Sequence, residues 1–176
     1  MSMPGIPFIY YGDEIGMKYL PDVVSVEGGY GRTGSRTPMQ WDDSVNCGFS
    51  LAPPDKLYIM QDPDSDRPTV EKQMNDKNSV LNELKKQIAV RKEYEVLQEN
   101  AGFELISCEY PLIYKRYTDD CVFCVAINPV DKKYEVEMKG TEEVKTIYSL
   151  NEEAHISDEK LVVPPLSATY IEILEK

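Results

Sequence analysis

Two adjacent carboxylates follow the first apolar run of the chain. Asp13 and Glu14 lie between Gly12 and Gly16, directly after the apolar and aromatic residues 4–11. The carboxyl end of a buried strand is where α/β folds place ligand sites, and paired carboxylates perform the acid/base chemistry of glycosidases. Neighbouring residues on an extended backbone point in opposite directions, so a turn must separate these two if they are to flank one bond. Two interpretations stay open: a structural role at the rim of a site, and direct catalysis.

A second segment that could do chemistry spans residues 32–42. It holds Arg32, Arg36, Gln40 and Trp41, the one tryptophan of the chain. Arginine offers a planar fork of five donors and tryptophan an apolar face, which together suit a polyhydroxylated or carboxylate ligand. The alternative is a surface ion pair beside a tryptophan that anchors the loop.

Charge and composition exclude several classes of function. The 176 residues include 31 acidic and 19 basic side chains, a formal net charge of -12. This charge disfavours nucleic-acid and membrane-surface binding and favours a neutral or cationic ligand. No apolar run approaches the roughly 20 residues of a membrane span and no secretion signal is evident, so we expect a soluble, cytoplasmic chain.

Cofactor and metal motifs are absent from the sequence. No phosphate-binding glycine motif, nucleophile elbow or metal-ligand pattern occurs, so we expect neither a cofactor nor a metal. The single histidine, His155, lies in a polar turn and rules out a His-dependent triad within this chain. Cys121 and Cys124 have redox or zinc spacing but lie in an apolar run without a second pair, which favours reduced thiols in a strand.

Hydrophobic patterns divide the chain into three parts. Residues 4–12 are typical of a strand buried on both faces, yet nothing in the next sixty or so residues could pair with it. Residues 13–77 are rich in Pro, Gly, Asp and Ser and show no period, which predicts a long loop. A helix is predicted from a cap at Asn78 or Ser79 to about Lys92, with one apolar face that must pack on a partner.

The remainder, from about residue 100 to 176, consists of short alternating runs separated by turns. This pattern predicts an antiparallel sandwich or barrel of about seven strands. The expected strands are 103–106, 112–117, 121–128, 134–138, 145–148, 161–163 and 168–174.

The order of these segments resembles the α-amylase family, glycoside hydrolase family 13. Residues 4–17 look like the eighth barrel strand of that family. Residues 35–42, with 47–50, look like the loop after that strand in members of the oligo-1,6-glucosidase, α-glucosidase and trehalose synthase type. Residues 88–92 resemble the end of the eighth helix, and the β-rich remainder matches the C-terminal domain in position and length.

The resemblance implies a mainly β chain. An antiparallel, Greek-key-type β-sandwich would occupy residues 98–176, preceded in residues 1–97 by the last strand, long loop and last helix of an incomplete (β/α)8 barrel. Family members act on α-glucosidic bonds by a retaining double displacement, and their catalytic carboxylates precede the eighth strand. A whole barrel needs about 250 residues, so we expect a C-terminal fragment that has no catalytic residue and is inactive alone.

The resemblance also implies a substrate contact and partners. Arg36 matches the arginine that helps hold the non-reducing glucose in exo-acting members, and Arg32 is the alternate candidate. The segment from residue 32 to 34 departs from the usual family pattern. The expected partners are an α-linked gluco-oligosaccharide bound by the parent enzyme, the N-terminal barrel part of that enzyme, and a second copy of the fragment through its uncovered strand and helix face.

The function of the β domain has two further interpretations. The domain can serve only to stabilise the barrel and keep its last helix docked. It can also be an independent carbohydrate-binding or interaction module, because aromatic faces stack on sugar rings. The tyrosines that suggest this alternative are Tyr110, Tyr114, Tyr117, Tyr134, Tyr148 and Tyr170.

Overall fold

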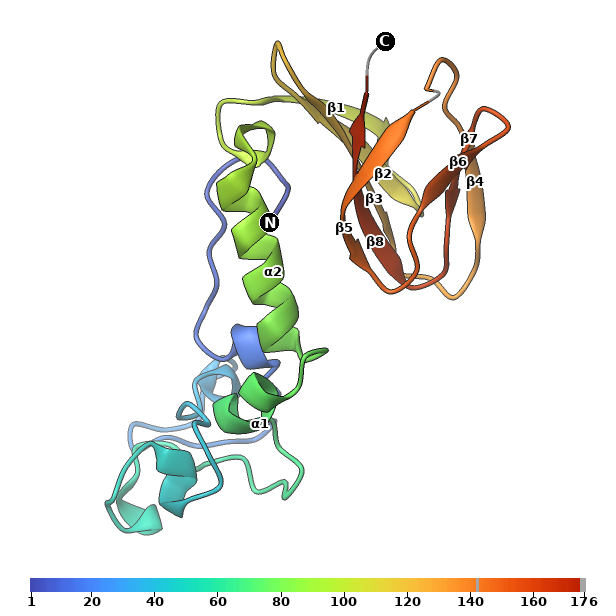
Figure 1. The fold of residues 1–176 in the computed structure, drawn as a ribbon. Coiled ribbons are helices and arrows are strands. Elements are labelled where there is room, and N and C mark those ends of the chain that lie inside the picture. The colour runs from blue at the N-terminus through green and yellow to red at the C-terminus, as the bar shows by residue number, and fades with distance from the viewer. Residues whose placement is uncertain (142, 175–176) are drawn as a thin grey trace. The chain divides into compact units, whose positions relative to one another are not determined.

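The chain forms two compact units in a computed structural model that describes residues 1–141 and 143–174 (Figure 1). One unit is the segment Phe8–Lys85, and the other joins Met1–Pro7 to the chain from Lys86 onward. None of the helices in the described residues combines the length and the apolar content that a bilayer crossing requires.

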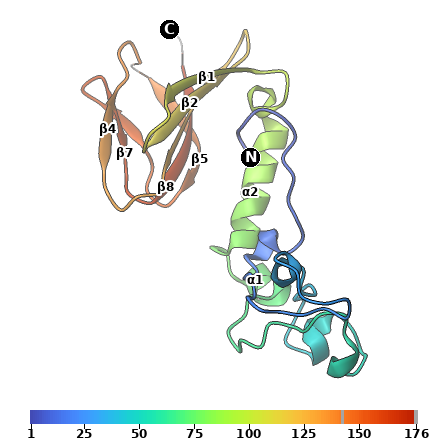
Figure 2. The ribbon, with the colours of Figure 1, turned by 180° about the vertical axis from the view of Figure 1, so that it is seen from behind.

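The second unit contains a β-sandwich built from antiparallel strands. Its strands are β1 (Gly102–Ser107), β2 (Leu112–Tyr117), β3 (Val122–Asn128), β4 (Tyr134–Glu137), β5 (Val144–Leu150), β6 (His155–Ser157), β7 (Lys160–Val163) and β8 (Ser167–Ile173). They form a five-stranded sheet in the order β1-β2-β3-β8-β5 and a three-stranded sheet in the order β4-β7-β6, which face each other in Figures 1 and 2. The prediction of a mainly β, antiparallel sandwich is confirmed.

Among the strands of the described residues, β6 is the one that the sequence pattern did not predict. It is short and polar, and it contains His155, which was expected in a turn. Each of its residues pairs with β7, so its strand conformation comes from that neighbour rather than from its own hydrophobic pattern.

Both faces of the central strands β2, β3 and β8 are covered, whereas β1 at the edge is largely exposed. Between the sheets lies a core of small and branched side chains, including Ile113, Leu161 and Ile171. The opposite face buries three of the candidate tyrosines with Val96 and Leu97, against side chains from the end of helix α2 (Val80–Glu93). The three are Tyr114, Tyr148 and Tyr170. These rings are core residues and are not available to stack on a sugar.

Cys121 and Cys124 pack on opposite faces of the five-stranded sheet. Cys124 lies in the core between the sheets, whereas Cys121 packs against the opposite core, so the two thiols do not converge on one site. All four cysteines of the chain are free. Burial raises the pKa of the Cys124 thiol to about 11 and that of the Tyr114 hydroxyl to about 12. Neither group is activated for chemistry near neutral pH.

These two raised pKa values predict a loss of stability at alkaline pH. Unfolding would expose each group, whose pKa would return to about 9 or 10, so the unfolded state would ionise first. The contribution of these two groups to the free energy of unfolding should be unchanged up to about pH 9 and then fall until about pH 12, by about 2–3 kcal/mol per group. Urea unfolding at several pH values measures this dependence.

Matched substitutions identify the two groups. Cys124→Ala and Tyr114→Phe should each make the alkaline decline shallower, whereas Cys108→Ala should leave it unchanged because Cys108 is exposed. An unaltered decline in both core variants would contradict this assignment.

The helix prediction is confirmed, with Ser79 as its cap. The Ser79 hydroxyl accepts the backbone N–H of Asn82 at 3.2 Å, and α2 then runs from Val80 to Glu93. A short helix that was not predicted, α1 (Val70–Asn75), precedes it and is capped by Thr69. The rest of residues 13–77 forms irregular structure with short 3-10 turns, as predicted for a long loop.

The segment 4–12 differs from the sequence prediction because it forms no strand. A strand needs a neighbour to hydrogen-bond, and the described residues provide none beside this segment. Its apolar side chains are exposed, to the extent of 93% for Phe8 and 71% for Ile6.

Two arginines hold the first residues of the chain within the second unit. Arg91 of α2 donates to the backbone carbonyls of Met1, Met3 and Gly5. Arg116 of β2 is fully buried and donates to the Ser2 carbonyl at 2.7 Å. The first residues are therefore fixed by a helix and a strand that lie far along the chain.

Candidate functional site

The carboxylates of Asp13 and Glu14 accept hydrogen bonds from the backbone of the turn to which they belong. Residues Asp13–Ile15 form a single 3-10 turn between Gly12 and Gly16. The Asp13 carboxylate accepts the Tyr10 backbone N–H at 3.2 Å, and the Glu14 carboxylate accepts the Gly12 backbone N–H at 2.6 Å. Both groups stabilise the local backbone, which supports the structural interpretation.

This turn is tied to the helices of its unit by Gln73. The side-chain amide of Gln73 donates to the Ile15 carbonyl at 2.6 Å and its oxygen accepts the Leu81 backbone N–H at 3.0 Å. One side chain of α1 therefore joins the turn to the first residues of α2, and it fixes the place of Glu14.

The loop that carries Arg36 and Trp41 is anchored through Gln40. This side chain is buried, and its amide donates to the Pro68 carbonyl at 2.5 Å. The carbonyls of Gln40 and Trp41 also accept the first backbone N–H groups of α1, both at 2.9 Å. Gln40 thus holds the loop in place and is not a free ligand group.

A close contact between two backbone segments accounts for the glycine at position 34, within the segment 32–34 that departs from the usual family pattern. The Leu20 N–H donates to the Gly34 carbonyl at 3.1 Å, and a Cβ atom at Gly34 would lie 1.8 Å from the Leu20 carbonyl oxygen. Only glycine allows this close approach of two backbone segments.

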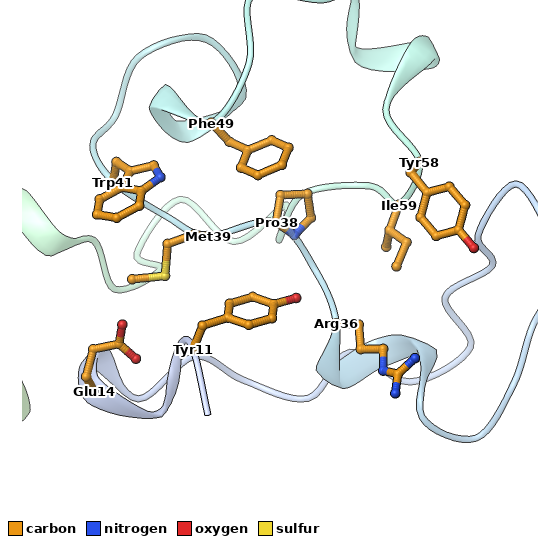
Figure 3. A pocket seen from close by; sticks show the side chains of 9 residues that line it. All are labelled: Tyr11, Glu14, Arg36, Pro38, Met39, Trp41, Phe49, Tyr58 and Ile59. Atoms are coloured by element: carbon orange, nitrogen blue, oxygen red, sulfur yellow. The ribbon is translucent and has the colours of Figure 1, made fainter. Parts of the chain in front are cut away.

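A cavity of about 440 Å³ lies within the unit Phe8–Lys85. We call it the aromatic cavity, because four aromatic rings, those of Tyr11, Trp41, Phe49 and Tyr58, lie around it (Figure 3). Its lining residues are Tyr11, Glu14, Arg36, Pro38, Met39, Trp41, Phe49, Tyr58 and Ile59. Arg36, Glu14 and Trp41, all singled out from the sequence, come together here.

The polar side chains that line the aromatic cavity differ in whether they already make hydrogen bonds within the protein. The Tyr11 hydroxyl donates to the Thr37 carbonyl at 3.2 Å, and burial raises its pKa above the ordinary value, while the positive charge of Arg36 opposes that rise. Glu14 supplies the one carboxylate among the lining residues. Arg36 is exposed and supplies the one full positive charge, so it is the side chain best able to bind a polar ligand.

Arg32 and Asp13 lie outside the aromatic cavity. The Arg32 guanidinium lies 6.0 Å from the centre of the Tyr30 ring, a cation–π contact on the surface. Asp13 is exposed and is not a lining residue. Of the two candidate arginines, therefore, Arg36 lines the aromatic cavity and Arg32 does not.

Phe49, Tyr58 and Ile59 were not identified as site residues from the sequence. They belong to loops with no periodic pattern, so nothing local indicates that they approach Trp41. The available signal is compositional, since large apolar side chains recur in a loop that is otherwise polar.

A family comparison assigns the first part of the chain. The model of the α-amylase catalytic domain matches residues 1–100, more than half of the chain. The chain belongs to the α-amylase family. The resemblance seen in the sequence is thereby confirmed.

Two relatives align with much of the chain. The glucan 1,6-α-glucosidase of Streptococcus pneumoniae is 30% identical over 200 residues, which cover 98% of this chain and 36% of that enzyme. The trehalose synthase/amylase of Mycobacterium tuberculosis is 40% identical over 109 residues, which cover 60% of this chain and 17% of that enzyme. This chain therefore spans about a third or less of the length of these relatives.

Solved structures share the fold. An isomaltulose synthase variant from Erwinia rhapontici, solved with D-glucose, superposes with a TM-score of 0.79 at 23% identity and covers 99% of this chain and 36% of that one. An α-amylase from H. orenii gives a TM-score of 0.73 at 24% identity and covers 98% of this chain and 33% of that one. At these identities the likeness establishes the fold alone.

Proposed function

We propose that this chain is the C-terminal part of a longer α-amylase-family enzyme that hydrolyses or transfers α-glucosyl units. The observation that carries the proposal is the match of residues 1–100 to the catalytic domain, together with relatives that extend far beyond the chain. The relatives that support this substrate class are described as a glucan 1,6-α-glucosidase, oligo-1,6-glucosidases and trehalose synthases.

The catalytic carboxylates would lie outside this chain. A retaining double displacement needs two carboxyl groups on either side of one bond, about 5–5.5 Å apart. Among the residues that line the aromatic cavity, only Glu14 has a carboxylate, and that carboxylate accepts the backbone N–H of Gly12. We infer that the chain alone is inactive and that no residue of it forms the glycosyl intermediate.

The exposed segment 4–12 supports a role as one strand of a barrel. It has the residue types of a buried parallel strand, but its Ile6 and Phe8 side chains are exposed and no strand of the described residues lies beside it. In the longer enzyme, we infer, two flanking strands would pair with it. Residues 1–97 would then complete the barrel and residues 98–176 would form the separate sandwich domain.

Arg36 is the substrate-binding residue in this proposal. Its guanidinium is exposed beside the aromatic cavity and can donate several charge-assisted hydrogen bonds to sugar hydroxyls. Arg32 already contacts the Tyr30 ring outside this cavity, so the geometry favours Arg36 of the two.

The sandwich would stabilise the enzyme rather than bind sugar. Its sheet already covers the end of α2 with buried tyrosines, which is how a supporting domain keeps a helix docked. Titration of the chain with maltotriose should leave the NMR signals of residues 98–176 unshifted, and a saturable shift of the exposed Tyr110 or Tyr117 would favour the sugar-binding module instead.

Turnover by the longer enzyme tests the proposal. Purified enzyme is assayed on maltose, isomaltose, trehalose and a chromogenic α-glucoside, and we expect hydrolysis or glucosyl transfer with at least one of them. Absence of turnover on all four by a folded enzyme would contradict the proposed substrate class.

A further inference from the structure

Arg36 takes its position from the backbone that carries it. Its side chain is exposed, and it is the group that binds the substrate in the proposed function. A binding group contributes most when neighbouring residues hold it close to the geometry that its ligand needs. The contacts that fix the backbone on either side of Arg36 therefore decide how well this group can act.

The backbone before Arg36 is fixed by a 3-10 turn. Residues Thr33–Ser35 form this turn, and the Arg36 N–H donates to the Thr33 carbonyl at 3.0 Å. The Leu20 N–H donates to the Gly34 carbonyl at 3.1 Å and joins the turn to another segment. These hydrogen bonds reach Arg36 from its N-terminal side.

The backbone after Arg36 is fixed by Tyr11. Thr37 is buried, and its carbonyl accepts the Tyr11 hydroxyl at 3.2 Å, although the two residues are 26 positions apart in sequence. Figure 3 shows this hydroxyl directed toward the backbone between Arg36 and Pro38. Burial raises the pKa of Tyr11 and the positive charge of Arg36 opposes that rise, as is expected of two groups that lie close together.

Tyr11 is itself held in place by its neighbours. Its ring centre lies 4.7 Å from that of Tyr10, and the N–H of the next residue, Gly12, donates to the Glu14 carboxylate. A tyrosine side chain has only two side-chain torsion angles, so little conformational freedom is lost when its hydroxyl is fixed. Tyr11 can therefore keep the Thr37 carbonyl at a defined distance from the turn that carries Glu14.

We propose that Tyr11 is the positioning residue of Arg36. Its hydroxyl holds the Thr37 carbonyl, and through it the backbone that directs the Arg36 guanidinium toward the substrate. This inference rests on the proposed function in one respect, that Arg36 binds the sugar. It adds that Tyr11 acts through Arg36 and not through a hydrogen bond of its own to the sugar.

Hydrogen exchange of the Arg36 amide tests this role without reference to activity. Tyr11→Phe removes the hydroxyl but keeps the ring, so exchange should become about three to ten times faster, in this chain and in the longer enzyme. NMR, or mass spectrometry of the peptide that contains Arg36, measures the rate.

Tyr19→Phe is the matched control for the exchange experiment. The Tyr19 hydroxyl donates to the Gly31 carbonyl at 3.1 Å, a bond of the same kind, and Tyr19 does not line the aromatic cavity. This variant should change the exchange of the Arg36 amide by less than about twofold. Unchanged exchange in Tyr11→Phe, or an equal change in both variants, would overturn the proposal.

A double-mutant cycle in the longer enzyme tests whether Tyr11 acts through Arg36. Tyr11→Phe alone should reduce kcat/KM for maltose or isomaltose by about three- to tenfold, with a higher KM and a lower kcat. In the Arg36→Ala background the same change should cost less than about twofold, because the group that Tyr11 positions is gone. An equal loss in both backgrounds would contradict the positioning role and would indicate a direct contact between Tyr11 and the sugar.

The two experiments separate this inference from the proposed function. If Arg36→Ala leaves kcat/KM unchanged while Tyr11→Phe speeds the exchange of the Arg36 amide, the substrate contact is refuted and Tyr11 still holds the backbone of Arg36. If Arg36→Ala lowers kcat/KM and Tyr11→Phe changes neither measurement, the substrate contact stands and Tyr11 is not its positioning residue.

Discussion

Replacing Arg116 by methionine should lower the free energy of unfolding of the sandwich unit by about 3–5 kcal/mol. The guanidinium is fully buried on β2 and donates to backbone carbonyls on two separate segments of the chain. These carbonyls belong to Ser2, Leu97, Gln98, Ala101 and Gly102. Methionine would fill a similar volume but leave the buried carbonyls of Ser2 and Leu97 without these donors. Urea unfolding followed by circular dichroism measures the loss.

Two further substitutions separate this effect from general damage to the strand. Lys115→Met removes the neighbouring positive charge from β2, where the side chain is only half-buried, and should cost less than about 1 kcal/mol. Arg116→Lys keeps the charge but loses the planar fork, so its loss should be intermediate. An Arg116→Met variant as stable as Lys115→Met would show that the five hydrogen bonds do not stabilise the fold.

Replacing Arg36 by alanine in the longer enzyme should reduce kcat/KM for maltose or isomaltose by about 10- to 100-fold. The loss follows from one or two charge-assisted hydrogen bonds between the guanidinium and the glucose hydroxyls. We expect a higher KM together with a lower kcat, because a sugar that is held less firmly is also less well oriented. Steady-state kinetics on short oligosaccharides measure both constants.

Arg32→Ala is the matched control for this prediction. Arg32 lies over the Tyr30 ring and does not line the aromatic cavity, so kcat/KM should change by less than about threefold. Unchanged kinetics for Arg36→Ala would remove Arg36 from the site, and a larger effect at Arg32 would move the substrate contact there.

The sandwich could be predicted from the sequence because its longer strands are short alternating or apolar runs of their own, separated by turn residues. The predicted ranges for β2, β3 and β8 agree with the observed strands to within one residue at each end. β6 and α1 were not predicted because both are short and depend on neighbouring segments. β6 depends on its pairing with β7, and α1 on the Thr69 cap and the loop around Gln40. The strand predicted over 4–12 needs partner strands that the described residues do not supply.

The aromatic cavity could be predicted only in part. Glu14, Arg36 and Trp41 stood out because charged and aromatic residues are concentrated around Gly and Pro there. Phe49 and Tyr58 reach the same cavity through loops whose course depends on single contacts, such as the Arg67 Nε–Cys47 Sγ hydrogen bond at 2.9 Å. Such contacts have no sequence period, so spacing alone could not bring these rings together.

Activity of this chain by itself tests most directly the claim that it lacks the catalytic carboxylates. The purified chain is incubated with maltose, isomaltose, trehalose and a chromogenic α-glucoside, with the longer enzyme as the positive control. We predict no turnover by the chain and turnover by the longer enzyme. Turnover by the chain that disappears in Glu14→Gln or Asp13→Asn would contradict the account, because it would place a catalytic carboxylate in the turn after residue 12.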